Sequence, residues 1–334
     1  MPVSNHYEKL AASAILVLGS PRSGTTWLAK IIDSHPDVLY RHEPDELAGP
    51  DQRAAPVDQI SAWIRQRGLR SAAKRPFFAK SWRPVPLEFT RKSLSLALAA
   101  AQRIPMTAAP ASRLALPDLV ALHRRHKVRA AVKLVNWDGS LAVETMPDCR
   151  CCFILRHPCG QVASIMAGWA DGRFAASGTG SGEPVDLAEA VSFAATKGVG
   201  KREFDALSDA GKLAWGWLAF NEPAVERLQH QPNARIVIYE DLCRQTESLS
   251  KDLFAFAGLE WQQQTAAFLA ASTRGGQSLG YYDVIRVTAV VADRWRQSMS
   301  RPDQDAVRAI VRTSPLTRYW SDLAADVNDP AITQ

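Results

Sequence analysis

The chain has 334 residues, of which 46% are hydrophobic and 22% charged, and this composition is typical of a folded globular protein. The sequence predicts no transmembrane helix, because it contains no apolar run of about 18 residues. Its net charge of +6 at pH 7 is not gathered into basic runs interleaved with aromatic residues. We therefore expect anionic small molecules rather than nucleic acid as partners, and a soluble protein of the cytoplasm.

The cysteines do not form the even set that is typical of a secreted disulfide framework. Adjacent residues on a strand point to opposite faces, so Cys151 and Cys152 are poorly placed to share a metal ion. The sequence therefore predicts reduced thiols in the core and no metal site. The five cysteines are Cys149, Cys151, Cys152, Cys159 and Cys243.

The first strand is predicted in the apolar segment 10–18, which leads directly into a loop opened by Gly19 and nearly closed by Gly24. We interpret this segment as a strand and not as a signal peptide, because no small-residue cleavage site precedes the loop. An amphipathic helix is predicted from Thr25 to Ser34. Strand, Gly-rich loop and helix N-terminus in this order form an anion site, where free backbone N–H groups and the helix dipole favour a phosphate.

The loop differs from the P-loop of nucleoside-triphosphate enzymes at one decisive position. Thr25 follows Gly24, where an NTPase has the lysine that reaches the β- and γ-phosphates. The cation of this loop is instead Arg22. The pattern favours a nucleotide with a single 5′-phosphate that carries another group to transfer, and a P-loop kinase or NTPase is the alternative.

The remaining elements are predicted from hydrophobic runs and the breaks between them. Strands alternate with helices, and their long connections indicate a parallel sheet in an α/β fold. In chain order the segments are a strand at 38–40, a helical insert at about 44–128, strands at 128–135 and 151–155, a second insert at about 171–212, a helix at 213–228, a strand at 236–239, and a terminal helix and turn at 307–320.

Residues Pro21 to Trp27 resemble the first signature of the sulfotransferases that use 3′-phosphoadenosine-5′-phosphosulfate (PAPS). The resemblance implies a three-layer, P-loop-like α/β fold with a central parallel sheet, in which helical inserts form the acceptor side of a single domain, residues 1–334. It also implies PAPS as donor, 3′,5′-adenosine diphosphate (PAP) as product, and no metal. The residues that it assigns to the donor at this loop are Arg22, Ser23, Gly24, Thr25, Thr26 and Trp27.

PAPS has a second phosphate at its 3′ position, and a second match supplies a site for it. Phe153 to Pro158 reads Phe-Ile-Leu-Arg-His-Pro, and Ser164 follows eight residues after Arg156. By resemblance, Arg156 at a strand end and Ser164 on the next helix hold the 3′-phosphate. Open parallel sheets also bind ligands at the carboxyl ends of their strands. An ordinary strand-end charge is the alternative for Arg156.

Two weaker matches complete the expected donor site. A Tyr-Glu-Asp-Leu segment resembles the family's own, which places Tyr239 beside the adenine, on which Trp27 would stack. Packing in the helix core is the alternative for Trp27. Arg294 and Arg296 belong to an Arg-Trp-Arg segment that resembles the basic loop of bacterial members over the 3′-phosphate, and solvated surface charge is the alternative for each of them.

Transfer of a sulfuryl group to a hydroxyl requires a base, and cations that neutralise the developing charge. Arg22 and the loop backbone can fill the cationic role on the 5′ side of the donor. The resemblance to the cytosolic animal branch implies the same role for Lys133, and a buried strand-end lysine paired to a carboxylate is the alternative for it. The histidine base of the cytosolic animal branch is missing, since Leu-Val follows Lys133 where Thr-His would stand. Residues 35–44 resemble the Glu-Pro segment of carbohydrate sulfotransferases, which makes Glu43 the expected base and His42 the alternative. A surface carboxylate or a salt-bridge partner of Arg22 is the other interpretation of Glu43.

The acceptor is expected between the two inserts. The Glu-Pro resemblance favours the hydroxyls of a glycan, while lipid, polyketide, other small amphipathic and tyrosine acceptors stay open. A non-catalytic protein that retains the nucleotide site is a third hypothesis. Aromatic and basic residues of the first insert either line the acceptor site or form the core and rim of a helical layer; they are Trp63, Lys74, Arg75, Phe77, Phe78, Lys80, Trp82 and Arg83.

Overall fold

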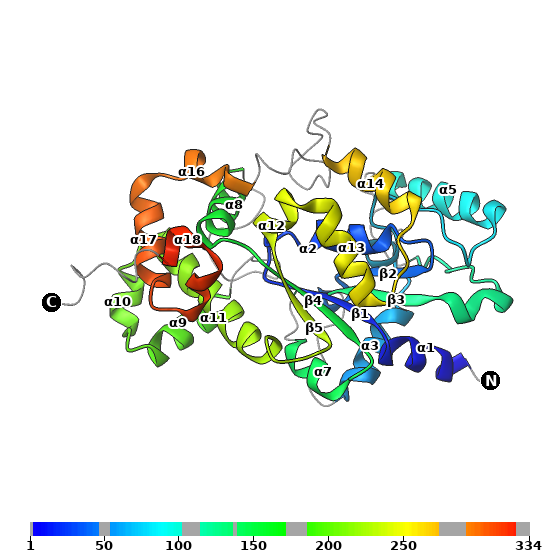
Figure 1. Ribbon diagram of the computed structural model, residues 1–334, viewed down its shortest axis with the longest axis horizontal. Coiled ribbons are helices and arrows are strands. Elements are labelled where there is room, and N and C mark those ends of the chain that lie inside the picture. The colour runs from blue at the N-terminus through cyan, green and yellow to red at the C-terminus, as the bar shows by residue number, and fades with distance from the viewer. Residues whose placement is uncertain are drawn as a thin grey trace.

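The centre of the molecule is a parallel sheet. The computed structural model describes residues 3–46, 54–101, 114–135, 139–171, 186–273 and 292–324. In these residues the strands lie in the order β2-β3-β1-β4-β5, every neighbouring pair is parallel, and Figure 1 shows them running through the middle of the molecule. The strands are β1 (Ile15–Leu18), β2 (Val38–His42), β3 (Arg129–Lys133), β4 (Arg150–Leu155) and β5 (Ala234–Ile238).

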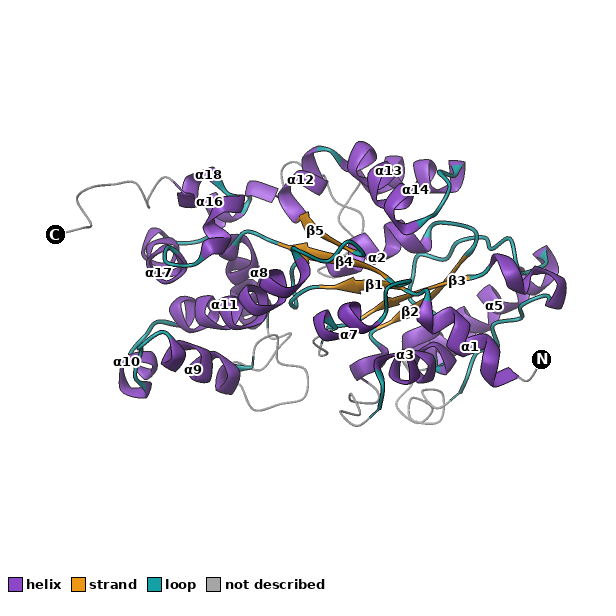
Figure 2. Ribbon diagram, turned by 60° about the horizontal axis from the view of Figure 1, so that its bottom comes forward, coloured by secondary structure: helices purple, strands orange, loops and turns teal. Residues whose placement is uncertain are grey.

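Helices cover both faces of the sheet, because successive side chains of each buried strand point to opposite faces. On β1, Leu16 and Leu18 belong to one apolar cluster, and Ile15 and Val17 belong to a second cluster. The first cluster includes residues of α1 (Val3–Ala12), α3 (Pro56–Arg65), α7 (Ser140–Thr145), α8 (Pro158–Ala170) and α11 (Asp209–Leu228). The second includes residues of α2 (Thr25–Asp33), α12 (Tyr239–Arg244), α13 (Thr246–Ala257) and α14 (Gln263–Thr273). This arrangement, visible in Figure 2, confirms the predicted three-layer, P-loop-like α/β fold.

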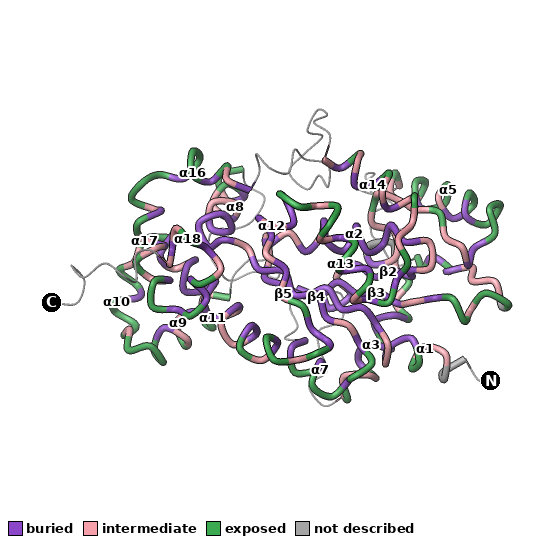
Figure 3. The backbone as a smooth tube through the Cα atoms, viewed as in Figure 1, coloured by how far each residue is buried: buried purple, intermediate pink, exposed green. Residues whose placement is uncertain are grey.

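Both predicted inserts are helical where the structure describes them. Between β2 and β3 lie η1 (Pro44–Glu46), α3, α4 (Leu69–Ala72), α5 (Val85–Ala101) and η2 (Leu122–Lys127). Helix α5 lies at the periphery, and Figure 3 shows that much of it is exposed. In the second insert α9 (Leu187–Thr196) and α10 (Lys201–Asp205) precede α11, and residues 172–185 lie outside the described residues.

The C-terminal part of the chain packs against α8 and α11. It consists of α16 (Trp295–Ser298), α17 (Arg301–Val311), η3 (Pro315–Tyr319) and α18 (Ser321–Ala324). The terminal helix begins earlier than the sequence predicts, because the Ser300 side chain caps it by accepting a hydrogen bond from the Asp303 N–H. Trp320 and Leu323 join the first apolar cluster, which anchors this segment to the core.

The prediction of one strand over residues 10–18 is wrong in its first part. Leu10 and Ala11 belong to α1, which packs on α3, and only Ile15–Leu18 form β1. Both residues are buried in the first apolar cluster, so their hydrophobic character is explained by helix packing. A short apolar run does not distinguish a helix end from a strand, and the break between the two elements here is only Ser13-Ala14.

The cysteines are buried in the core and none forms a disulfide, as predicted. Burial raises the pKa of the Cys149 thiol to about 11 and the pKa of each of the Cys152, Cys159 and Cys243 thiols to about 12. These four thiols are therefore protonated at neutral pH and are poor nucleophiles. Among the described helices, none has the length and the apolar run needed to cross a membrane.

Candidate active site

The phosphate loop predicted at residues 19–24 joins the end of β1 to the N-terminus of α2. Gly24 has a φ of +104°, and a Cβ atom there would lie 2.5 Å from the ring of Tyr239. A Cβ atom at Gly19 would lie 2.6 Å from the carbonyl oxygen of Ile154. Only glycine fits at either position, so the loop backbone can pass close to β4 and α12.

The loop lies at a switch point of the sheet, where β1 has β3 on one side and β4 on the other. Open α/β sheets bind ligands in the crevice that forms at the carboxyl ends of the strands at such a point. Lys133 ends β3, and Arg156 directly follows β4. Two of the predicted cations therefore come from the strands on either side of the loop.

The two predicted phosphate motifs meet in space. Arg22 Nε donates a hydrogen bond to Ser164 Oγ at 3.3 Å, and Arg156 Nη1 donates one to the carbonyl oxygen of Arg22 at 2.9 Å. The guanidinium of Arg156 also lies 4.7 Å from the ring centre of Tyr239, in a cation–π arrangement. Residues from β1–α2, β4–α8 and α12 thus form one site.

Two buried polar atoms of this site lack a protein partner. Ser23 Oγ and Arg156 Nε are both buried, and neither has a hydrogen-bond partner among the described residues. A buried donor or acceptor left without a partner costs about 1–3 kcal/mol. The oxygens of a bound phosphate can accept hydrogen bonds from both groups, so the residues present fit a phosphate-bearing ligand.

The two aromatic residues predicted for the adenine lie together beside the loop. The ring centres of Trp27 and Tyr239 are 6.3 Å apart with an interplanar angle of 75°, which is an edge-to-face contact. Each residue is 8% exposed, and both belong to the second apolar cluster. Trp27 therefore packs in the core, and stacking on an adenine stays a prediction for it.

The Arg-Trp-Arg segment reaches this site through its tryptophan. Trp295 stacks on His157 with ring centres 4.4 Å apart and an interplanar angle of 15°. It also covers Gly160 of α8, where a Cβ atom would lie 3.1 Å from Trp295 and 3.3 Å from Arg156 Nε. The segment therefore packs on the N-terminal turn of α8, next to the predicted 3′-phosphate residue.

The two arginines of the segment have other surroundings. Arg296 donates hydrogen bonds to Asp293 at 3.2 Å and to Asp322 at 3.1 Å. Burial alone would lower the pKa of Arg296, but the carboxylates of Asp322 and Asp293 raise it above its usual value. Arg294 is the N-cap residue of α16 and follows residues 274–291, which lie outside the described residues. Contact of either arginine with a 3′-phosphate stays a prediction.

The predicted catalytic residues form one connected group at the carboxyl ends of β2 and β3. The register places His42 opposite Lys133, and Glu43 N–H donates a hydrogen bond to the Lys133 carbonyl oxygen at 2.9 Å. Lys133 Nζ forms an ion pair with Glu43 Oε1, and Glu43 Oε2 lies 3.3 Å from His42 Nε2. The other ring nitrogen of His42 lies 2.8 Å from the Tyr40 hydroxyl.

Exposure differs between the members of this group. The side chains of Lys133 and His42 are 2% and 3% exposed, whereas that of Glu43 is 18% exposed. Glu43 also has a φ of +46°, a left-handed conformation that is uncommon for a residue with a side chain. The chain therefore turns sharply after β2. Of the Lys133, His42 and Glu43 side chains, that of Glu43 is the most accessible to solvent.

The aromatic residues of the first insert divide between the core and a cavity. Trp63 is fully buried in the first apolar cluster, so packing explains it. Phe77, Phe78 and Trp82 border a cavity beside β2, although Trp82 is itself only 1% exposed. Arg75 is exposed and does not line this cavity.

A model of the sulfotransferase family matches residues 14–263 of the 334. The chain belongs to the sulfotransferase family. The match begins at β1 and ends at α14, so it includes the loop, the Lys133–Glu43 group and Arg156 of this sulfotransferase. The Arg-Trp-Arg segment lies beyond it.

Solved structures of other sulfotransferases resemble this one distantly. Mouse SULT7A1 complexed with PAP is 16% identical over 92% of this chain and 88% of its own, with a TM-score of 0.45. The sulfotransferase domain from the curacin biosynthetic pathway is 12% identical over 90% of this chain and 96% of its own, with a TM-score of 0.43. STF1 from Mycobacterium tuberculosis H37Rv is 17% identical over 87% of this chain and 79% of its own, with a TM-score of 0.36. Likeness at this level says nothing about the acceptor of this sulfotransferase. No curated protein sequence matches the chain.

A polar network behind the loop supports the candidate site, and the sequence did not indicate it. Gln161 Nε2 donates hydrogen bonds to Ser20 Oγ at 2.8 Å and to the Pro21 carbonyl oxygen at 2.9 Å. Asn221 Nδ2 lies 3.4 Å from Ser20 Oγ and donates to the Trp217 carbonyl oxygen at 2.8 Å. These side chains fix the loop from α8 and α11. The only signal for them in the sequence is a polar residue on an otherwise apolar helix face.

Proposed function

We propose that this sulfotransferase transfers a sulfuryl group from PAPS to an acceptor hydroxyl. The observation that carries the proposal is the convergence of two phosphate motifs, in which Arg22 contacts Ser164 and Arg156 contacts the Arg22 backbone. A donor with phosphates at its 5′ and 3′ positions needs two such sets of groups side by side. A nucleoside triphosphate would instead need a lysine where Thr25 stands.

In this proposal the donor binds at the carboxyl edge of β1 and β4. The backbone N–H groups of residues 23–26 and the positive end of the α2 dipole favour the 5′-phosphate. Arg156 and Ser164 hold the 3′-phosphate, for which a guanidinium offers a matched pair of N–H donors. Bound PAPS supplies an activated sulfuryl group with a phosphate as its leaving group.

Glu43 serves as the general base. It accepts the proton of the acceptor hydroxyl while the hydroxyl oxygen bonds to sulfur and the bond from sulfur to the 5′-phosphate oxygen breaks. His42 is less suited to this role, because its side chain is 3% exposed and its two ring nitrogens face Glu43 and Tyr40. His42 therefore orients the Glu43 carboxylate, and Tyr40 orients His42.

Lys133 links the proton transfer to the departure of PAP. Its ammonium group neutralises the Glu43 carboxylate in the ion pair. When Glu43 takes up a proton, that negative charge disappears, and the Lys133 charge acts on the negative charge developing on the leaving phosphate. Arg22 adds a second positive charge on the loop side of the site.

The acceptor in this proposal is a hydroxyl of a glycan or of another small amphipathic molecule. The support for a glycan is the Glu-Pro segment at Glu43, which resembles that of carbohydrate sulfotransferases. The helical inserts would form the acceptor side. Among the described residues no group of three or more His, Cys, Asp or Glu side chains is arranged to hold a metal ion, and the proposed transfer uses none.

Isothermal titration calorimetry with PAP, 5′-AMP and ATP tests the donor assignment. Because a 3′-phosphate adds charge-assisted hydrogen bonds worth about 2–3 kcal/mol, we expect PAP to bind roughly 30- to 150-fold more tightly than 5′-AMP. EDTA should leave this affinity unchanged. Equal affinities for PAP and 5′-AMP would contradict the assignment of a 3′-phosphate site. A magnesium-dependent preference for ATP would support the kinase or NTPase alternative.

A further inference from the structure

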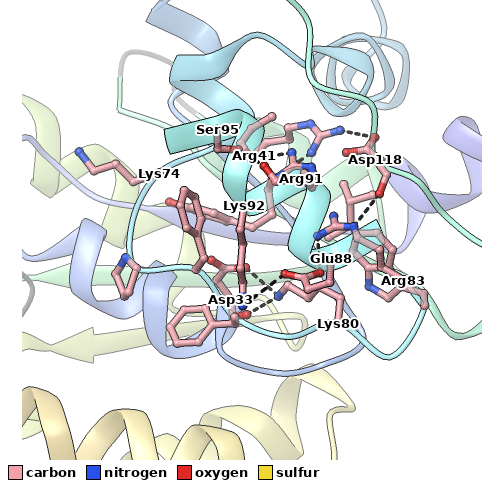
Figure 4. Close-up of a pocket in the computed structure, with 17 residues that line it drawn as sticks. Asp33, Arg41, Lys74, Lys80, Arg83, Glu88, Arg91, Lys92, Ser95 and Asp118 are labelled. Atoms are coloured by element: carbon pink, nitrogen blue, oxygen red, sulfur yellow. Dashed lines mark hydrogen bonds and ion pairs between the residues drawn. The ribbon is translucent and has the colours of Figure 1, made fainter. Parts of the chain in front are cut away.

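A cavity lies beside β2, the edge strand of the sheet, and is bordered by α5 and by the connection that leads into α5 (Figure 4). Its volume is about 40 Å³, which is enough for a few waters or one small charged group. Aromatic side chains border it, namely Tyr40, Phe77, Phe78 and Trp82. Arg22, Arg156 and Ser164 of the donor site do not line it.

Basic side chains outnumber acidic ones around this cavity. Six basic and three acidic residues line it, so its lining has a formal charge of +3 at neutral pH. Figure 4 shows Arg41, Arg91 and Asp118 together at one end, and Lys80 with Asp33 at the other. The basic residues are Arg41, Lys74, Lys80, Arg83, Arg91 and Lys92.

The acidic residues are already neutralised by other cations. Lys80 contacts Asp33 at 2.9 Å, Arg41 contacts Asp118 at 2.7 Å, and Arg83 contacts Glu88 at 2.5 Å. Lys30 is a further partner of Asp33. None of the three carboxylates forms an ion pair with Arg91.

Arg91 is a buried cation whose guanidinium, within the described part of the chain, forms hydrogen bonds to backbone carbonyls alone. It is 7% exposed, and its guanidinium donates hydrogen bonds to the carbonyl oxygens of Pro117 at 3.1 Å and Ala72 at 2.9 Å. Among the described residues no carboxylate forms an ion pair with it. Burial, together with the nearby Arg83 charge, lowers the pKa of Arg91 to about 10, so it is still cationic at neutral pH. The carboxylates of Asp118 and Glu88 act on Arg91 from a distance, but each is paired with another arginine. An anionic ligand would supply the direct ion-pair partner that this buried guanidinium lacks among the described residues.

The chemistry of the lining selects an oxyanion on an organic molecule. A guanidinium pairs with carboxylate or sulfate through two parallel hydrogen bonds, which a simple halide cannot match. Aromatic walls suit the carbon skeleton that carries such a group, and a sugar ring or another flat apolar face can pack on them.

The cavity is connected to the catalytic group through β2. Tyr40 borders the cavity, and its hydroxyl lies 2.8 Å from His42 Nδ1, while the other nitrogen of His42 faces Glu43. Tyr40, His42 and Glu43 therefore form one chain of contacts that leads from the cavity to the proposed base. We propose that the cavity binds a carboxylate or sulfate group of the acceptor, which makes the acceptor an anionic molecule whose reactive hydroxyl lies at Glu43, on the other side of His42 from Tyr40. The acceptor role rests on the proposed sulfotransfer, whereas binding of the oxyanion does not.

The test measures oxyanion binding with the donor site filled. The protein is saturated with PAP, so that the phosphate loop cannot take up the probe, and its melting temperature is followed at constant ionic strength as sodium sulfate, D-glucuronate or D-glucose replaces sodium chloride. We expect saturable stabilisation by sulfate and by D-glucuronate and none by D-glucose. Arg91→Gln should lower the affinity for both anions at least tenfold. Arg202→Gln, which removes one exposed charge from α10, should leave both affinities unchanged.

The outcomes separate the parts of the proposal. No stabilisation by sulfate, or an equal response in Arg91→Gln, overturns the site. Stabilisation by sulfate but not by D-glucuronate restricts the site to a free inorganic anion and overturns the acceptor role. If Arg91→Gln does not fold, two other measurements replace it. Weaker sulfate binding in Lys92→Gln and an anomalous selenate signal beside Arg91 in wild-type crystals support the site, and the absence of both overturns it. If PAP does not bind, the titration is repeated without PAP in Arg156→Ala, so failure of the donor assignment is not confused with failure of this one.

Discussion

Arg156 is the residue that joins the two halves of the proposed donor site, since it contacts both the loop backbone and the Tyr239 ring. Arg156→Ala should lower PAP affinity by about 2–3 kcal/mol, or roughly 30- to 150-fold, because it removes charge-assisted hydrogen bonds in a partly desolvated site. Calorimetry measures the change, and the circular dichroism spectrum should stay native. Arg312→Ala removes an exposed arginine of the same charge and serves as the control. Unchanged PAP affinity in a folded Arg156→Ala protein would leave Arg156 as a strand-end charge only.

Glu43 is the residue on which the chemical step depends in our proposal. Glu43→Gln keeps the shape of the side chain and removes the proton acceptor, so turnover should fall by about 10²- to 10⁴-fold. PAP affinity should change little, because the Glu43 carboxylate is paired with Lys133 and lies beside His42, and the proposed donor contacts are made by the loop, Arg156 and Ser164. Steady-state rates and calorimetry measure the two effects. Full activity in Glu43→Gln together with its loss in His42→Ala would transfer the role of base to His42.

At the scale of elements, the sequence predicts secondary structure best where residues close together in the chain determine it. The loop between β1 and α2 depends on local chemistry, with glycine at both of its ends, and it lies where the sequence predicts it. Arg156 and Ser164 were found because a motif marks both. The contact between Arg22 and Ser164 follows from the sheet order, which brings β4 beside β1.

The parts that the sequence did not predict depend on contacts between distant segments. Gln161 and Asn221 support the loop from two separate helices, and no local pattern relates either of them to Ser20. The excess charge around Arg91 becomes visible only when α5 and β2 are placed together. Residues 10–12 were misassigned because apolar character alone does not distinguish helix from strand.

The close approach of the loop to α12 gives a prediction about these elements. Gly24→Ala would force a side chain into a position with φ +104° and within 2.5 Å of the Tyr239 ring, so it should lower stability by more than 2 kcal/mol and abolish PAP binding. Urea unfolding measures the loss of stability, and calorimetry measures the loss of PAP binding. The matched control is Gly198→Ala, because Gly198 has φ +86° but open space around its Cα, so it tests the backbone strain alone. Equal losses in both variants would show that contact with Tyr239 does not matter.

At the scale of the whole molecule, the C-terminal segment completes the surroundings of the donor site. Asp322 of α18 lies 3.5 Å from His157 Nε2 and receives hydrogen bonds from Arg296 and Arg308, each at 3.1 Å. Trp320 donates a hydrogen bond at 3.1 Å to Glu240, a member of the Tyr-Glu-Asp-Leu segment. The last described helix, α18, therefore contacts His157, the residue that follows Arg156.

This cluster predicts how the stability of the molecule depends on pH. His157, with Arg296 and Arg308, lowers the pKa of Asp322 well below its usual value. A carboxyl whose pKa is depressed in the folded state stabilises the protein above the pKa of the unfolded state, about 3.9, and this stabilisation is lost as the pH falls toward the folded pKa. Asp322→Asn resembles the protonated form at every pH. It should therefore cost about 1–2 kcal/mol at pH 7, and the difference from wild type should begin to shrink below about pH 5. Urea unfolding of both proteins at pH 7, 5 and 3.5 measures this difference, with Asp305→Asn, an exposed change on α17, as the control. A difference that stays constant over this range would mean that the charge of Asp322 does not stabilise the segment.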